Sequence, residues 1–194
     1  EVRKRAIENL INREIQGLIV IGGDGTFTGA SLLATEMKIP IIGIPGTIDN
    51  DIFGTERCIG YDTALNTVVE AVDKIRDSAL SHHRIFFIEV MGKNSGYIAL
   101  NSALASGLEI VLIPEVKSDL HVIVSQIEKQ IESTKSCIVI VAEGDDIGGL
   151  NNLIEKLKPR LMHYDIRSTV LGHLQRGGSP SAFDIILATK MGIY

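Results

Sequence analysis

The chain contains 194 residues, of which 45% are hydrophobic and 22% charged, a composition typical of a globular protein large enough to bury its own core. A formal net charge of −5 excludes an overall basic surface for nucleic acid, and the longest stretch without a charged residue, 94–108, is too short and too polar to cross a bilayer. Two cysteines cannot build a zinc site or a disulfide framework, which indicates a reducing, cytoplasmic setting.

The pattern of apolar residues predicts helices that alternate with strands. Residues 1–14 have the spacing of an amphipathic helix, and 17–21 form a continuous apolar run typical of a strand buried on both faces. Further strands are predicted at 41–44, 85–90, 110–113, 137–142 and 166–171, and further helices at 27–37, 61–80, 95–106, 119–132, 150–161 and from about 181. This alternation favours right-handed βαβ units, mostly parallel sheets and therefore the α/β class.

Glycine clusters and polar residues follow most of the predicted strands. The segments concerned are 22–26, 45–51, 91–96, 143–146 and 172–178. In a parallel sheet all the carboxyl ends lie at one edge, where open α/β sheets bind their ligands. We therefore expect these segments to converge on a single site.

Gly22, Gly23, Asp24, Gly25 and Thr26 lead from a strand into a helix. Glycines at this place let backbone N–H groups approach phosphate oxygens, and the helix N-terminus favours negative charge. Asp24 among phosphates is suited to holding Mg²⁺. The segment is neither a Walker A loop nor a dinucleotide-binding signature. The alternative is a plain tight turn with Asp24 as a cap, and position at a strand end favours phosphate binding.

Thr47-Ile48-Asp49-Asn50-Asp51 places two carboxylates two residues apart, so an extended segment points both to the same side. One could accept a proton while the other binds a metal near transferring phosphate. An Asx-rich turn after Pro45-Gly46 explains the same composition equally well. The residues alone do not decide between these two interpretations.

Several cations lie beside the predicted strands, namely Arg84, Lys93, Arg167, His173 and Arg176. Each alone is more typical of a solvated surface charge, and His173 alone of a structural histidine, but five together favour phosphate recognition. Residues 177–180 add a flexible helix-entry loop with further donors for phosphate.

Other polar and sulfur-containing residues receive structural interpretations. The His82–His83 pair is expected at a helix C-terminus. Asp145 and Asp146 are expected in a solvated loop. No nucleophile signature surrounds the cysteines, Ser95 or Ser179.

The chain closely resembles the 6-phosphofructokinase family over essentially its whole length, through the ordered motifs GGDGT, PGTIDND, EVMGKNSG, EG and GHLQRGG. GGDGT alone also occurs in NAD kinases and lipid kinases, whereas PGTIDND together with GHLQRGGSP is highly specific. The resemblance implies phosphorylation of the 1-hydroxyl of fructose 6-phosphate by MgATP, in glycolysis. It further implies two three-layer α/β domains in a homotetramer: an ATP-side domain of 1–60 plus 175–194, and a sugar-side domain of 61–174.

The resemblance also implies a role for each motif. Asp49 matches the catalytic base, Thr47 and Lys93 match groups that orient or stabilise the moving phosphoryl, and Asp24 and Asp51 match magnesium ligands. The ATP-phosphate loop corresponds to Gly22, Gly23, Asp24, Gly25 and Thr26. Contacts to the sugar phosphate correspond to Thr47, Asp49, Arg84, Met91, Gly92, Lys93, Glu143, Arg167, His173 and Arg176, with Arg84 and Arg167 reaching across from a neighbouring subunit. An effector site for ADP or phosphoenolpyruvate corresponds to Arg76, Gly107 and Glu109.

Two glycines bear on the phosphoryl donor. Relatives that use pyrophosphate typically carry Asp in place of Gly25 and Lys in place of Gly46, so the resemblance implies ATP. The alternatives are a pyrophosphate-dependent enzyme, another GGDGT kinase that acts on NAD or a lipid head group, and a catalytically silent relative. Another GGDGT kinase does not explain PGTIDND, and a silent relative usually lacks the catalytic carboxylates.

The sequence departs from the family pattern in two respects. Lys93 stands where Arg is usual, so we expect activity lower than that of a Lys93→Arg variant. The chain starts at Glu1 without an initiator Met or signal peptide, and a further Gly-rich strand-loop and a C-terminal segment are expected beyond its ends. We therefore expect an interior fragment that does not catalyse the reaction unaided.

Overall fold

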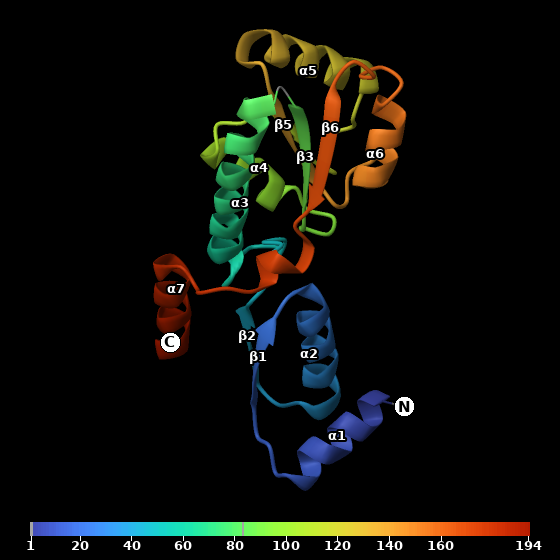
Figure 1. Cartoon of the computed structure of the whole chain (residues 1–194). Helices are drawn as coiled ribbons and strands as arrows, with labels where there is room; N and C mark the ends of the chain where they lie inside the picture. The colour runs from blue at the N-terminus through green and yellow to red at the C-terminus, as the bar shows by residue number, and fades with distance from the viewer. Residues whose placement is uncertain (1, 83) are drawn as a thin grey trace.

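The computed structural model describes residues 2–82 and 84–194, and these residues form two parallel sheets surrounded by helices (Figure 1). In chain order the elements are α1 (Val2–Asn12), β1 (Leu18–Gly22), α2 (Asp24–Met37), β2 (Ile41–Pro45), α3 (Tyr61–His82), β3 (Arg84–Val90), α4 (Tyr97–Ala105), β4 (Ile110–Leu112), α5 (Leu120–Thr134), β5 (Cys137–Ala142), α6 (Leu150–Leu157), β6 (Asp165–Val170), the 3-10 helix η1 (Gly172–Arg176) and α7 (Ala182–Ile193). His83, and with it the prediction for the His82–His83 pair, lies outside the described residues.

Every predicted strand and helix has a counterpart in this order, so the α/β class with parallel sheets is confirmed. The ends of the elements differ. α2 begins at Asp24 instead of 27, because Asp24, Gly25 and Thr26 join the first helical turn, and α6 ends at Leu157 instead of 161. The sequence did not predict η1, since a single turn of five residues has too few apolar positions to show a period.

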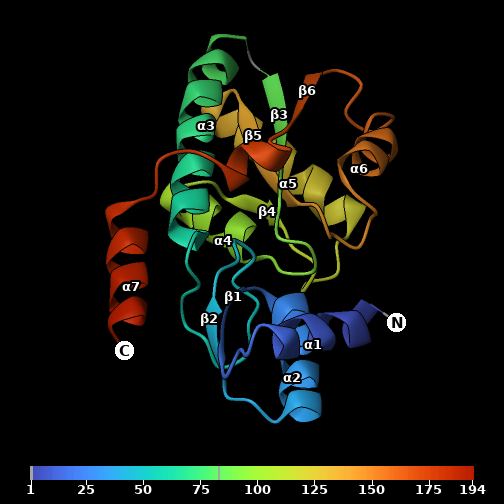
Figure 2. The same cartoon turned by 90° about the horizontal axis from the view of Figure 1, so that it is seen from below.

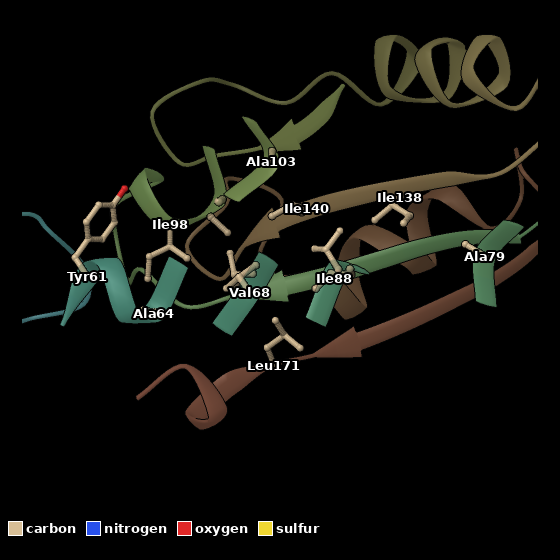
Figure 3. Packing of buried hydrophobic residues seen from close by; sticks show 14 residues of the cluster. Tyr61, Ala64, Val68, Ala79, Ile88, Ile98, Ala103, Ile138, Ile140 and Leu171 are labelled. Carbon is tan, nitrogen blue, oxygen red and sulfur yellow. The ribbon is translucent and has the colours of Figure 1, made fainter. Parts of the chain in front are cut away.

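The larger part of the molecule is a three-layer sandwich. Its four-stranded sheet has the order β4-β5-β3-β6, with α3 and α4 on one face and α5 and α6 on the other (Figures 1 and 2). Successive residues of a strand point to opposite faces. In β5, alternate residues from Ile138 to Ala142 therefore pack with α3 and α4, and the intervening ones with α5 and α6. Figure 3 shows the first of these two cores, with Val68 and Ile98 packed near Ile88 and Ile140.

The smaller part consists of β1 and β2, which pair in parallel, with α2 packed on the sheet and α1 beside α2. Ile19 and Ile21 are each 66% exposed and Ile42 is 60% exposed. The prediction that the first strand is buried on both faces is therefore wrong for this chain. The reason is that, among the described elements, α2 covers one face of this sheet and nothing comparable packs on the other.

The last helix, α7, is joined to the N-terminus of α3. The Asp184 carboxylate is 2% exposed and accepts hydrogen bonds from Gly60 N (3.0 Å), Thr63 N (2.8 Å) and Thr63 Oγ1 (2.5 Å). These partners lie on either side of the predicted domain boundary at 60/61, so α7 sits at the junction of the two predicted domains, and their division remains a prediction. Within residues 2–82 and 84–194, no helix combines the length and apolarity needed to span a membrane.

Candidate active site

The carboxyl ends of the strands in both sheets surround a cleft of about 510 Å³. Segments after β1, β2, β3, β5 and β6 all contribute to it, so the predicted convergence of the glycine-rich and polar segments is confirmed. The residues that line the cleft are Gly23, Gly46, Thr47, Ile48, Asp49, Ile59, Met91, Lys93, Glu143 and Arg176.

The N-terminus of α2 enters this cleft without a side-chain cap. Gly23 is the N-cap residue and has no side chain to offer, and no side chain in the described part of the chain accepts from the first N–H groups of this helix. The helices of the larger part are different, because carboxylates accept from N–H groups at their starts. Asp184, Glu115 and Glu89 reach α3, α4 and α6 from elsewhere in the chain, whereas Asp119 is the N-cap of α5 and Asp145 lies just before α6. Unpaired N–H groups and the positive end of the helix dipole suit α2 to bind an anion.

Thr26 explains why the loop before α2 needs glycine. Its side chain packs over Gly22, and a Cβ on Gly22 would overlap it. The backbone of β1 and the first turn of α2 can therefore approach each other only with glycine at this position. Gly46 N donates to Gly22 O at 3.0 Å and joins the loop after β2 to the same turn.

The Thr47–Asp51 loop is held by its own polar groups and by Ser95. Thr47 Oγ1 accepts from Asp49 N at 3.2 Å, and Ser95 Oγ donates to Asp49 O at 3.1 Å. Asn50 is 6% exposed, has φ of +53°, and accepts from Cys58 N at 2.8 Å through Oδ1. Thr47 thus forms a side-chain turn with Asp49 N, Asn50 ties the loop to Cys58, and Asp49 lines the cleft. A turn is therefore present, and the proton-acceptor and metal-binding roles of the two carboxylates stay predictions.

Asp49 lies among both signs of charge. Burial raises the pKa of its carboxyl above the ordinary value, and the negative charges of Asp51 and Glu143 raise it further. The positive charges of Lys93 and Arg176 lower it in part. A carboxylate with a raised pKa accepts a proton more readily, as a general base must.

The loop after β3 faces Asp49 across the cleft. Gly92 and Lys93 have φ of +146° and +55°, and their N–H groups donate to Oε1 of Glu143 at 3.3 and 2.7 Å. A Cβ on Gly144 would overlap Lys93 O, so glycine at 144 allows the segments after β3 and β5 to touch. Lys93 and Glu143 are thus held side by side at the rim of the cleft.

The model of the Phosphofructokinase family matches residues 1–194, the whole chain. The chain belongs to the phosphofructokinase family. It is 51% identical over 193 residues to ATP-dependent 6-phosphofructokinase 2 of Bacteroides thetaiotaomicron, covering 99% of this chain and 59% of that relative. It is 54% identical over 195 residues to ATP-dependent 6-phosphofructokinase of Macrococcus caseolyticus, covering 100% of this chain and 60% of that relative. The structure of Pichia pastoris phosphofructokinase superposes with a TM-score of 0.88 at 35% identity, covering 98% of this chain and 24% of that one. The chain thus spans about 59% of the length of the first of these relatives.

Of the five cations that the sequence singles out, Lys93 and Arg176 line the phosphofructokinase cleft. His173 lies in a neighbouring hollow of about 530 Å³ between η1 and α3. Arg84 and Arg167 both pair with Asp165, at 2.6 and 3.1 Å. Arg84 begins β3, at the opposite end of the strand from the cleft and about 20 Å away at the usual rise per residue. The structure therefore does not bring Arg84 into the cleft of its own chain.

The prediction that Asp145 and Asp146 lie in a solvated loop is wrong for Asp145. Asp145 is 5% exposed, and its Oδ1 accepts from Gly149 N at 2.8 Å, because the buried start of α6 needs an acceptor. Asp146 is exposed and accepts from Ser118 N at 3.1 Å. Asp145 is thus a structural carboxylate.

The residues of the predicted effector site lie away from the cleft. The Arg76 guanidinium donates to Ser106 O, next to Gly107, which has φ of +63°, and Glu109 is exposed just before β4. These contacts show how the segment is held, and its effector role stays a prediction.

Three polar residues that support the cleft were missed by sequence reasoning, namely Asn50, Ser95 and Gln175. All three are buried and bonded to the loops that carry Asp49 or Met91. In the sequence, only their position inside the motifs pointed to these residues. A loop has no periodic pattern of apolar residues, so its sequence does not show which side chains are buried.

Asp24 and Asp51 fit a magnesium ion that takes its other ligands from phosphate and water. Both carboxylates are exposed, at the start of α2 and in the loop after β2. No cluster of three or more histidine, cysteine or acidic side chains able to hold a metal occurs in the part of the chain that the structure describes. Mg²⁺ in phosphoryl-transfer enzymes typically has one or two carboxylates and several phosphate and water oxygens. The donor set is therefore suitable for an ion that arrives with a nucleotide.

Proposed function

We propose that the protein is an ATP-dependent 6-phosphofructokinase, which transfers the γ-phosphoryl group of MgATP to the 1-hydroxyl of fructose 6-phosphate. The observation that carries this proposal is the position of Asp49. A carboxylate with a raised pKa lines the same cleft as an uncapped helix N-terminus and two cations. This combination serves phosphoryl transfer, which needs positioning and charge stabilisation and little covalent chemistry by the protein.

On the donor side, the N–H groups at the start of α2 bind phosphate oxygens, and Asp24 and Asp51 hold the magnesium ion. When bound, the ion neutralises charge on the donor phosphates. The Asp49 carboxylate takes the proton of the sugar hydroxyl as its oxygen forms a bond to the γ-phosphorus. The bond from that phosphorus to the bridging oxygen breaks, and ADP leaves with the electron pair. Thr47 orients the moving group, and Lys93 and Arg176 stabilise its negative charge.

On the acceptor side, Met91, Gly92, Glu143 and His173 contact the sugar phosphate. Arg84 and Arg167 serve the site of a neighbouring subunit in a homotetramer, and Asp165 holds their guanidinium groups in place. Arg76, Gly107 and Glu109 belong to an effector site for ADP or phosphoenolpyruvate. The enzyme acts in glycolysis, in the cytoplasm, with 1–60 plus 175–194 forming the ATP side and 61–174 the sugar side.

The surroundings of two glycines support ATP over pyrophosphate as the donor. A Cβ on Gly25 meets nothing within 4 Å, so the first turn of α2 leaves open space for a large donor. A Cβ on Gly46 would lie 3.1 Å from Ile21, so the tight approach of the two loops disfavours a lysine there. Turnover with MgATP but not with magnesium pyrophosphate is the expected result.

The experiment measures ADP release from MgATP, with and without fructose 6-phosphate, by the protein at its full natural length. Asp49→Asn should lower sugar-dependent kcat by about 10²- to 10⁴-fold, the usual contribution of a general base. Asp73→Asn, at an exposed position of α3, is the matched control and should leave kcat unchanged. Binding of MgATP without turnover by the unmodified protein would instead identify a catalytically silent relative.

A further inference from the structure

Three successive backbone N–H groups after β3 donate to side-chain oxygens. Met91 N donates to Oε1 of Gln175 at 3.1 Å, and the next two N–H groups donate to Oε1 of Glu143. The loop contains two consecutive residues with positive φ, one of them the non-glycine Lys93. Backbone in this conformation persists only where its surroundings hold it. The two side chains therefore fix the loop that presents Lys93 to the cleft.

Gln175 is the buried member of this pair. Its side chain is 1% exposed and uses both ends of its amide, because Oε1 accepts from Met91 N while Nε2 donates to Gly172 O at 3.0 Å. Gly172 begins η1, the short turn between β6 and α7 in Figure 1, and Arg176 ends it. One amide thus connects the loop after β3 to the turn that carries Arg176.

We propose that Gln175 is a positioning residue of the phosphoryl-transfer site, an inference that rests on the proposed function. Met91, Lys93 and Arg176 line the same cleft, and the first two belong to a different segment from the third. The amide of Gln175 sets the distance between these segments, so that Lys93 and Arg176 face the same phosphoryl group. Gln175 itself is not among the residues that line the cleft.

The first test is Gln175→Met in the protein at its full natural length. Methionine keeps the volume of the side chain and removes both hydrogen bonds. At a temperature where circular dichroism shows the variant fully folded, kcat should fall by about a hundredfold, as for a displacement of catalytic groups by about 1 Å. KM for ATP should change little, since α2 is untouched. Gln16→Met, at an exposed position, is the control. A folded Gln175→Met variant with kcat within twofold of the unmodified protein overturns the proposal.

The second test uses pH to separate positioning from mere filling of space. In Gln175→Glu, a protonated carboxyl group can still donate to Gly172 O and accept from Met91 N, whereas the ionised group repels the Gly172 oxygen. Burial raises the pKa of such a carboxyl, so it becomes ionised as pH rises. The ratio of variant to unmodified kcat should therefore fall between pH 5 and 9. Asp49, Glu143 and His173 are common to both proteins and cancel in this ratio. A ratio that is the same at every pH contradicts the proposal.

Amide hydrogen exchange of the peptide that contains Met91 and Lys93 needs no turnover. It should be faster in Gln175→Met than in the unmodified protein, and faster only in this segment and in η1. If the unmodified protein shows no kinase activity, the proposed function fails while this measurement still decides the role of Gln175. Unchanged exchange shows that the amide does not hold the loop.

Discussion

The four-stranded and the two-stranded parts of the molecule use the same βα units but bury them differently. β5 is buried at all six positions between two layers of helices, whereas β1 alternates between half-buried and exposed residues. Parallel strands normally have both faces covered. The centre of the larger part is therefore packed on both faces, whereas the smaller part leaves Ile19, Ile21 and Ile42 on an open face.

The two parts also differ in whether side chains cap the N-termini of their helices. Carboxylates distant in the sequence cap α3, α4 and α6, the N-cap residue Asp119 caps α5, and the N-terminus of α2 has no side-chain cap in the described chain. A capped terminus stabilises the fold, while an uncapped one at a cleft is available to a ligand. The larger part therefore contributes packed, capped helices, and the smaller part contributes a helix N-terminus that is suited to bind an anion.

Removing a buried leucine tests the packing side of this comparison and should have the largest effect. Leu153 of α6 is fully buried, so Leu153→Ala should lower the free energy of unfolding by about 2–5 kcal/mol. Ile21→Ala, on the open face of β1, should cost about 0.5 kcal/mol or less in this 194-residue chain. Urea unfolding of both variants measures the difference. Equal losses at the two positions would show that the open face is covered in solution.

The cap that joins α7 to α3 should have the next largest effect. In Asp184→Asn only one oxygen remains for three donors, and the amide nitrogen must face another donor, so a loss of about 1–3 kcal/mol is expected. Asp119→Asn is the matched control, because this exposed cap of α5 accepts from His121 N and asparagine caps helices as well as aspartate does. A loss at Asp184 no greater than at Asp119 would show that the junction is not held by this carboxylate.

Lys93 lies on the larger part and faces the smaller one, and its replacement should have a more modest effect. Lys93→Arg should raise kcat a few-fold, because a guanidinium makes two parallel contacts to a phosphoryl group where an ammonium makes one. Lys156→Arg on the exposed face of α6 should leave kcat unchanged. Steady-state kinetics with MgATP and fructose 6-phosphate measures both. An unchanged or slower Lys93→Arg enzyme contradicts the expectation.

The sequence predicted most where a residue's environment repeats along the chain. β5 is a continuous apolar run and α3 has a helical period, so the elements and the convergence of the strand ends on Asp49 could be predicted. The cap from Asp184 to Thr63 and the bond from Gln175 to Met91 join residues more than 80 positions apart, and no local pattern encodes such a pair. The open face of β1 was missed because an apolar run shows what a strand can bury and says nothing about what covers it.

The two cysteines compare how easily the two parts of the molecule open, and this difference should be the smallest of those predicted. Burial raises the pKa of the Cys137 thiol in β5 to about 12 and raises that of Cys58, beside the cleft, in the same direction. Both thiols stay protonated and unreactive in the folded protein at pH 8, so a thiol reagent should label them only through opening. Cys58 should react first at low urea concentration, because its loop joins the less buried part. Mass spectrometry of the labelled peptides gives the order, and simultaneous labelling would mean that the two parts open together.

The same thiol gives the pH dependence of stability. In the unfolded chain Cys137 has its ordinary pKa of 9.0, and in the folded protein it keeps its proton up to about pH 12. Between these values the unfolded state binds fewer protons, so the free energy of unfolding should fall as pH rises, by at most about 1.4 kcal/mol per pH unit from this group. Cys137→Ala should flatten the decline between pH 9 and 10 relative to Cys58→Ala, whose thiol has the smaller shift. Parallel declines in the two variants would show that the thiol of β5 is not protected by the four-stranded core.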